Sequence, residues 1–256
     1  MTESLMNLWH PIASAEDLPY RHIFQGQLLG RELAVWRADD DFVNVWENRC
    51  LHRGTRLSIG RNDGLELRCQ YHGWRYANRS AGCTYIPAHP ADAPARTICN
   101  RTFPSVERYG LIWSGEEPIG EPPEIAALEN AETLLLRNIA VNAPLNLVLG
   151  HLANYRFSIT GDPDNLATTS MDYQDECSLS LTATCDGKES TVVFFVQPVD
   201  SNRSVIRGVL SNSPEGAERL LTLRHHSAEL SRLRDIVELE ALDGPSLEPM
   251  VATIEQ

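Results

Sequence analysis

The chain has 256 residues and a formal net charge of −13, and 42% of its residues are hydrophobic. This length suffices for one large domain or two modest ones with a buried core, and the acidic balance argues against a nucleic-acid partner, whose phosphates need a basic face. No stretch reaches the roughly 18 to 20 apolar residues that span a bilayer, and the first residues lack the features of a secretion signal, so we expect a cytoplasmic protein.

Short strands dominate the first half. Residues 27–37 and 42–48 are rich in apolar and aromatic residues and are separated by the turn 38–41, a pattern that predicts strand, turn and strand. Further short strands are expected at 65–69, 73–76 and 110–113. The first half is therefore predicted to be a small antiparallel β domain whose loops gather at one tip.

Two of these loops carry a paired motif of metal-ligand residues. Cys50 and His52 lie in the first, Cys69 and His72 lie in the second, and a glycine follows each pair closely. A Cys2His2 zinc site is the main alternative, but zinc fingers usually keep their two Cys together and their two His together. A Rieske [2Fe-2S] cluster, in which two Cys hold one iron and two His hold the other, fits the mixed order better. The alternative without a metal is that the two cysteines are buried structural thiols and that the two histidines lie near them by chance.

Other residues near this motif are given plainer roles. Tyr71 and Trp74 are expected to cover the cluster by packing rather than to relay electrons. The remaining cysteines are expected to be free thiols in a reducing compartment: Cys83, Cys99, Cys177 and Cys185.

The first 118 residues or so resemble the Rieske non-haem iron oxygenase family, especially its branch of vanillate and dicamba O-demethylases. The resemblance runs through these segments: 8–11 (LWHP), 15–18 (AEDL), 28–32 (LLGRE), 35–37 (VWR), 50–54 (CLHRG), 71–74 (YHGW), 86–88 (IPA) and 110–113 (GLIW). It implies a [2Fe-2S] cluster held by Cys50, His52, Cys69 and His72. Beyond this part the resemblance weakens.

A linker is expected after residue 118, because residues 115–124 combine prolines with acidic side chains. We therefore expect two domains, a Rieske domain at 1–118 and a shortened oxygenase-like domain at 119–256. The predicted elements of the second domain are one strand formed by 134–136 and 139–141, further strands at 178–184, 190–199 and 204–210, and helices at 145–157 and 215–242. Asn142 is the expected N-cap of the first helix and Pro144 lies in its first turn. Helices packed on an antiparallel sheet make the fold class α+β.

Two expected details concern turns and packing. Asp186 and Gly187 predict a hairpin turn between two of these strands. The long helix is expected to bury an apolar stripe at helical spacing, formed by Leu220, Leu223, Leu230, Leu233, Ile236 and Val237.

The second domain departs from the family at its iron site. The resemblance implies a mononuclear Fe(II) bound by two His and one carboxylate, with both His on one helix. His151 lies where the first is expected, but Tyr155, Arg156 and Phe157 occupy the positions of the second. Asp235 lies in a segment that resembles the one carrying the carboxylate. His151 and Asp235 are therefore a possible remnant of the site, and a bound mononuclear iron is doubtful.

Nearby residues offer alternatives to an iron site. His225 and His226 are candidate ligands by type, but their polar surroundings favour solvated surface histidines. His151 is equally well explained as a core histidine. A buried Arg156 would oppose a divalent metal and favour a carboxylate partner, for which Asp162 and Asp164 are the candidates.

Three functions are consistent with these observations. The first is an oxygenase with a divergent iron site that oxidises a small organic substrate. The second is a cluster-bearing subunit that relays electrons to a homologous partner with a complete triad, and the third is a regulatory homologue whose cluster is a sensor. The family resemblance implies a ring oligomer. No dinucleotide or flavin fingerprint is present, so a ferredoxin or flavin reductase is expected to donate the electrons. The sequence names neither the substrate nor the reductase.

Overall fold

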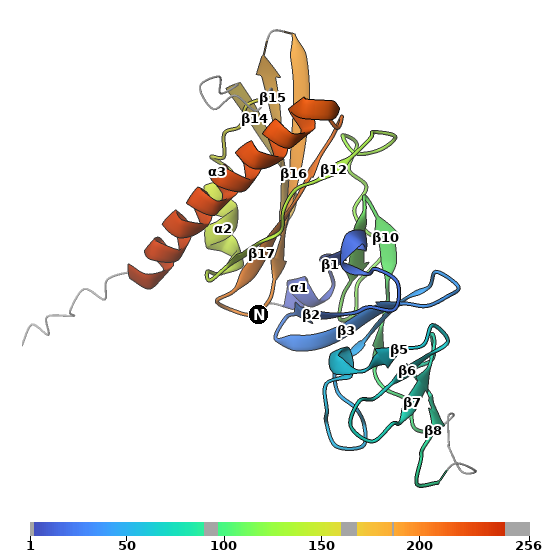
Figure 1. Ribbon diagram of the computed structural model, residues 1–256. Helices are drawn as coiled ribbons and strands as arrows, with labels where there is room; N and C mark the ends of the chain where they lie inside the picture. Colours follow the sequence, from blue (N-terminus) through green and yellow to red (C-terminus); the bar gives the residue numbers. More distant parts are fainter. Residues whose placement is uncertain (1–2, 90–96, 160–167, 186, 244–256) are drawn as a thin grey trace, which may run out of the picture.

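The structure is a computed structural model that describes residues 3–89, 97–159, 168–185 and 187–243. Its N-terminal half, residues 3–114, is built from small antiparallel sheets, and its C-terminal half, residues 134–243, from one larger sheet with two helices (Figure 1). The predicted boundary at residue 118 falls between them, in a segment without helix or strand. Within the described residues, no helix is long and apolar enough to cross a membrane.

Three sheets form the N-terminal half. Their strand orders are β2-β3-β4-β9, β5-β6-β7-β8 and β1-β11-β10. The strands are β1 (His10–Ser14), β2 (Ile23–Leu28), β3 (Arg31–Arg37), β4 (Val43–Glu47), β5 (Arg61–Asn62), β6 (Glu66–Arg68), β7 (Arg75–Ala77), β8 (Cys83–Tyr85), β9 (Thr102–Phe103), β10 (Val106–Arg108) and β11 (Leu111–Ser114). The short helices are α1 (Glu3–Met6), η1 (Ala15–Asp17) and η2 (Leu57–Ile59).

The strand expected at 27–37 is instead a hairpin. β2 ends at Leu28 and β3 begins at Arg31, and Leu29 and Gly30 between them both have positive φ, 50° and 83°. Two consecutive residues with positive φ are typical of the type I′ turn, whose twist matches that of the paired strands. The prediction was wrong here because the turn contains leucine rather than the usual Asn or Asp.

An aromatic core supports the sheet that carries the metal-ligand motif. Trp36 and Trp46 meet edge to face with ring centroids 5.2 Å apart, and both are buried together with Tyr76. Cys50 and Cys69 belong to the same core cluster. The two cysteines are therefore fixed by packing from below, while their loops face outward.

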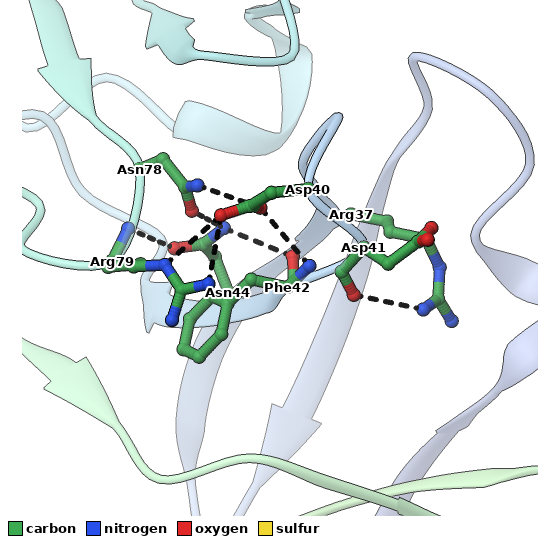
Figure 2. A network of polar contacts seen from close by, with 7 residues as sticks. All are labelled: Arg37, Asp40, Asp41, Phe42, Asn44, Asn78 and Arg79. Atoms are coloured by element: carbon green, nitrogen blue, oxygen red, sulfur yellow. Dashed lines mark hydrogen bonds and ion pairs between the residues drawn. The ribbon is translucent and has the colours of Figure 1, made fainter.

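A polar network joins this sheet to its neighbour (Figure 2). Asp40, in the turn after β3, accepts hydrogen bonds from Asn78 at 3.0 Å and from the Arg79 guanidinium at 2.9 Å, and Arg79 also lies over the Phe42 ring. Asn44 of β4 bonds to the Asn78 side chain at 2.8 Å and to the Arg79 amide at 2.8 Å. The Arg79 guanidinium holds the pKa of Asp40 below its usual value. The network fixes the orientation of the two sheets.

The C-terminal half is a six-stranded antiparallel sheet with helices on one face (Figure 1). Its strand order is β12-β17-β16-β15-β14, and β13 also pairs with β17. The elements are β12 (Leu134–Leu135), β13 (Ile139–Val141), α2 (Leu145–Leu152), β14 (Thr168–Asp175), β15 (Ser178–Cys185), β16 (Lys188–Pro198), β17 (Ser204–Leu210) and α3 (Gly216–Asp243). The hairpin between β15 and β16 is confirmed, since Cys185 pairs with Lys188, but Asp186 itself lies outside the described residues. β14 had no counterpart among the predicted strands.

The two helices differ from expectation in detail. α2 ends at Leu152, five residues earlier than predicted, and Pro144 rather than Asn142 is its N-cap. α3 closely follows the predicted bounds, but Leu220 and Ile236 of the predicted stripe are exposed, at 59% and 52%. The buried face of α3 is more polar, and its residues are Thr222, His225, His226, Leu230, Leu233 and Val237.

A buried arginine joins the two halves. Arg207 of β17 is 4% exposed and donates hydrogen bonds to the Pro11 carbonyl at 2.9 Å and the Ile12 carbonyl at 2.8 Å, both in β1. It also donates to the Gln197 side chain at 3.0 Å. Burial lowers the pKa of Arg207 to about 10, so the side chain stays charged at neutral pH. The interface is thus fixed by a cation that backbone carbonyls solvate.

Candidate functional site

The two ligand loops share one backbone geometry. In the first, the Cys50 amide donates to the Thr55 carbonyl at 2.8 Å, and the Gly54 amide donates back to the Cys50 carbonyl at 2.8 Å. In the second loop, the Cys69 amide donates to the Trp74 carbonyl at 2.8 Å, and the Gly73 amide donates to the Cys69 carbonyl at 3.1 Å. Each of these glycines lies four residues after its cysteine, and both have φ near +70°, where other residues are strained.

The four predicted ligands divide into a buried pair and an exposed pair. Cys50 and Cys69 are 3% and 2% exposed, whereas His52 and His72 are exposed, with ring centroids 4.6 Å apart. In a Rieske cluster one iron takes two thiolates and the other takes two imidazoles. The residues present therefore fit that cluster, with its sulfur-bound iron inside and its histidine-bound iron at the surface.

Burial also sets the protonation of these groups. It raises the pKa of Cys69, so this thiol stays protonated unless a metal replaces the proton. Local desolvation by neighbouring loop atoms, followed by the charges of His52 and Arg53, lowers the pKa of the exposed His72. A neutral imidazole is the form that binds a metal, so the surroundings favour the liganding state of His72.

Tyr76 belongs to the candidate site and was missed by the sequence interpretation. Its hydroxyl lies 3.2 Å from the Cys50 Sγ and accepts a hydrogen bond from the Leu51 amide at 3.2 Å. Burial raises the pKa of Tyr76, so the phenol keeps its proton. A metal-bound thiolate at Cys50 has no proton to give, so the hydroxyl would be the donor in this contact. A tyrosine two residues after the Trp of the second loop was the available signal.

The aromatic residues beside the loops lie against the histidines. Trp74 stacks on His52 with ring centroids 5.0 Å apart and 6° between the planes. Tyr71 lies 3.8 Å from His72 by ring centroids and is 60% exposed. Both rings cover the outer pair of ligands, an arrangement in keeping with the predicted packing role.

The candidate iron ligands of the C-terminal half are not brought together. The His151 Nε2 lies 2.8 Å from a carboxylate oxygen of Glu240, whereas Asp235 is exposed on α3 and accepts a hydrogen bond from Arg234 at 2.7 Å. In the part of the chain that the structure describes, no three His, Cys, Asp or Glu side chains gather where one metal ion would lie. These residues do not fit an iron held by two His and a carboxylate.

Three further expectations for this region need correction. His225 and His226 are not surface histidines: they are 7% and 0% exposed. The Ser158 amide donates to His225 Nε2 at 3.1 Å, and His226 Nδ1 bonds to the Tyr155 hydroxyl at 2.8 Å. Both are buried on the sheet-facing side of α3, and each has one ring nitrogen bonded to one of these two partners.

Arg156 is exposed rather than buried and donates to the Thr169 hydroxyl at 3.0 Å. It therefore places no buried charge at the expected ligand position. Its expected partners Asp162 and Asp164 lie outside the described residues.

Comparisons with known proteins agree with the cluster geometry. The family model of the Rieske [2Fe-2S] domain matches residues 8–107, which decides between the cluster and zinc. Oxidoreductase NdmD of Pseudomonas putida is 48% identical over 151 residues, which cover 57% of this chain and 26% of that protein. Methylxanthine N1-demethylase NdmA of the same organism is 37% identical over 117 residues, covering 43% and 32%. The chain spans about a quarter to a third of the length of these relatives.

Solved structures extend the likeness to the whole fold. NdmA of Pseudomonas putida CBB5 superposes with a TM-score of 0.77 at 20% identity, covering 96% of this chain and 85% of the other. Apo dicamba monooxygenase gives 0.76 at 19% identity, covering 94% and 88%. The sequence match and the cluster geometry identify residues 8–107 as a Rieske [2Fe-2S] domain, and the solved structures show that the chain as a whole shares the fold of NdmA and of dicamba monooxygenase.

Proposed function

We propose that this chain is the cluster-bearing component of a Rieske-type oxygenase system, in which it passes single electrons for the O2-dependent oxidation of a small organic molecule. The observation that carries the proposal is the division of ligands into buried Cys50 and Cys69 and exposed His52 and His72. When bound, a [2Fe-2S] cluster accepts and releases one electron at a time, and its His ligands raise its potential above that of an all-Cys cluster.

The chain's own residues make this transfer directional. The aromatic core excludes water from the two cysteines, and the Tyr76 hydroxyl is held 3.2 Å from the Cys50 sulfur. His52 and His72 are the ligands that reach the surface, so an electron enters and leaves on their side. Arg53, exposed in the same loop, gives this side a positive charge on a chain that is acidic as a whole.

The electron is proposed to act in another subunit. The ligand loops and the helices of the C-terminal half lie at opposite ends of the chain (Figure 1), and the described residues of α2 and α3 do not fit a mononuclear iron. We therefore propose an oligomer, arranged as a ring, in which the cluster faces a homologous subunit with a complete triad. A ferredoxin or flavin reductase supplies the electrons.

The names of relatives indicate the substrate class. They include a methylxanthine N1-demethylase and toluene-4-sulfonate monooxygenase subunits, which are named for ring compounds. A small ring compound is accordingly the proposed substrate of the system. The second candidate function, oxygenase chemistry within this chain, requires a ligand set that includes residues outside the described part.

Iron and acid-labile sulfide per chain distinguish the two candidates. The protein is incubated anaerobically with Fe(II), the excess is removed, and both elements are measured, with a His151→Ala variant as the matched control. Two iron and two sulfide, unchanged in the variant, support the proposed electron carrier. A third iron that is lost from His151→Ala establishes an unconventional mononuclear site and favours the second candidate. Absence of sulfide contradicts both.

A further inference from the structure

The two ligand loops carry arginines at matching positions. Residues 49–56 read RCLHRGTR and residues 68–75 read RCQYHGWR, so in each loop one arginine directly precedes the cysteine and another follows six residues after it. Neither stretch contains Asp or Glu. Like charges this close in sequence repel one another unless a carboxylate offsets them. The loops therefore depend on carboxylates from other parts of the chain for charge compensation.

One carboxylate of β3 joins the two ends of the first loop. Glu32 Oε2 lies 2.8 Å from Arg49 Nη2, and the two Glu32 oxygens accept hydrogen bonds from Arg56 Nη2 at 2.5 Å and Arg56 Nε at 3.2 Å. The contact with Arg56 is thus bidentate, the geometry that gives an arginine–carboxylate pair its strength and its orientation. Because Arg49 and Arg56 flank the segment that contains Cys50 and His52, Glu32 links both ends of that segment.

The same network reaches into the loop backbone. Arg49 Nη1 donates to the Gly54 carbonyl at 3.3 Å, two residues beyond His52. The main chain of Glu32 adds a further contact, since its carbonyl accepts a hydrogen bond from the Asn48 amide at 2.9 Å. We call Glu32, Arg49 and Arg56 the Glu32 network. It connects the start, the end and the glycine of the loop to one residue of a strand.

The second loop has no equivalent of this network among the described residues. Arg75 lies 3.7 Å from the nearest carboxylate, that of Glu66, and its guanidinium lies over the Tyr85 ring. Arg68 forms no ion pair with a carboxylate in the described part of the chain. The two arginines of the second loop therefore share no carboxylate there, which makes this loop an internal control for the first.

The position of Glu32 makes its contacts more effective than those of an ordinary surface ion pair. Single exposed pairs contribute little, because they are screened and cost side-chain freedom, whereas bidentate pairs within a network are the exception. The Glu32 side chain is only 17% exposed, and β3 lies inside its sheet between β2 and β4. The hydrogen bond from Arg56 holds the pKa of Glu32 below its usual value, so the carboxylate is ionised at neutral pH.

We propose that Glu32 is a positioning residue of the cluster site: through Arg49 and Arg56 it fixes the first ligand loop, and its charge offsets these two arginines beside the cluster. Glu32 contacts none of the predicted ligands itself, so it acts through the loop. A reduced cluster carries one more negative charge than an oxidised one, so uncompensated arginines nearby raise its reduction potential. The inference does not rest on the proposed electron partners, because it concerns the Rieske domain alone.

Amide hydrogen exchange, read by mass spectrometry on the cluster-loaded protein, tests the positioning directly. Glu32→Gln is expected to speed exchange in residues 49–56 at least about threefold and to leave residues 68–75 unchanged, which also shows that the domain is folded. Asp63→Asn removes the same charge from a carboxylate that pairs with Arg61 instead. This matched control should leave both loops unchanged.

A redox titration of the same proteins tests the effect of the charge. Glu32→Gln is expected to favour the reduced cluster about threefold, roughly 30 mV for one electron, whereas Asp63→Asn should shift the potential much less. The proposal requires both changes in Glu32→Gln, and either one without the other overturns it. It is also overturned if Asp63→Asn matches Glu32→Gln in both measurements.

Two further variants separate position from charge. Glu32→Asp keeps the charge but is one methylene shorter, so it is expected to speed exchange in residues 49–56 while the potential stays near that of the parent. The double variant Glu32→Gln with Arg56→Gln restores the net charge, so its potential should also be near parental although exchange remains fast. Parental exchange in Glu32→Asp or in the double variant would show that charge alone matters and would refute the positioning role.

Discussion

The two ends of the molecule treat their histidines in opposite ways. At the cluster end, His52 and His72 are exposed, and their backbone is held by two loops of matching geometry. At the helical end, His225 and His226 are buried, and one ring nitrogen of each bonds to a protein group. A histidine becomes a ligand where its nitrogen is left free at a rigid loop, and a core residue where the fold supplies a partner.

The strongest test of this comparison removes one ligand from each end. Cys69→Ala is expected to abolish the cluster, with complete loss of its visible absorption and of the electron paramagnetic resonance of the reduced protein, because the remaining three ligands leave one iron unsaturated. His151→Ala should leave both signals unchanged. Cys83→Ala, a buried thiol in the same core cluster, is the matched control. Retention of the cluster in Cys69→Ala would contradict the ligand assignment.

The sequence predicted the cluster end well because its information is local. All four predicted ligands and both glycines lie within 25 residues, and their spacing alone indicates the chemistry. The hydroxyl of Tyr76 was missed because a tyrosine in a short strand has many uses, and only the three-dimensional fold places it beside Cys50. The Leu29 turn was missed for a related reason, since its positive φ is imposed by strand pairing rather than by residue type.

The helical end was predicted in outline but not in its packing. The bounds of α3 followed from its composition, yet its buried face includes a threonine and two histidines, which a search for apolar stripes passes over. The partner that makes His226 a core residue is Tyr155, 71 positions away. Burial of a polar side chain depends on such distant partners, and one sequence does not show them.

A second prediction tests how the two ends are joined. Arg207→Met is expected to lower the free energy of unfolding by about 2 to 4 kcal/mol, because the Pro11 and Ile12 carbonyls lose their donors within a buried interface. Urea unfolding measures the change. Arg203→Met, at an exposed arginine paired with Asp200, should cost no more than about 1 kcal/mol. An unchanged or raised stability in Arg207→Met would mean that desolvation of the guanidinium outweighs its hydrogen bonds.

The pH dependence of stability sharpens the contrast between the histidines. The pKa of His226 is lowered to about 3 in the folded protein, against about 6.5 when unfolded. Below pH 6.5 the unfolded chain therefore binds a proton that the folded one excludes, and stability falls as the pH falls. At pH 5 the loss from this residue is about 2 kcal/mol.

His226→Phe should remove that part of the pH dependence. The measurement is the difference in unfolding free energy between pH 7 and pH 5, which is expected to be about 2 kcal/mol smaller in the variant than in the parent. His22→Phe, at an exposed histidine of the N-terminal half, serves as the comparison and should keep the parental difference. Equal differences in all three proteins would show that His226 is able to protonate in the folded state.

The smallest expected effect concerns the potential of the cluster itself. Tyr76→Phe removes the hydroxyl that lies 3.2 Å from the Cys50 sulfur and leaves the aromatic core filled. A hydrogen bond to a ligating sulfur stabilises the reduced, more negative cluster, so its loss lowers the reduction potential. A bond worth about 0.5 to 1.5 kcal/mol corresponds to roughly 20 to 60 mV for one electron.

A redox titration, with circular dichroism as its readout, measures this shift in potential. Tyr85→Phe is the control because the Tyr85 ring contacts Arg75 instead. Iron and sulfide content should be unchanged in both variants, which separates tuning from ligation. A potential in Tyr76→Phe equal to the parental one would mean that the hydroxyl donates elsewhere when the cluster is bound. A fall confined to Tyr76→Phe would instead show that the hydrogen bond to the Cys50 sulfur raises the reduction potential of the cluster, so the buried side of the site would tune the driving force for electron transfer.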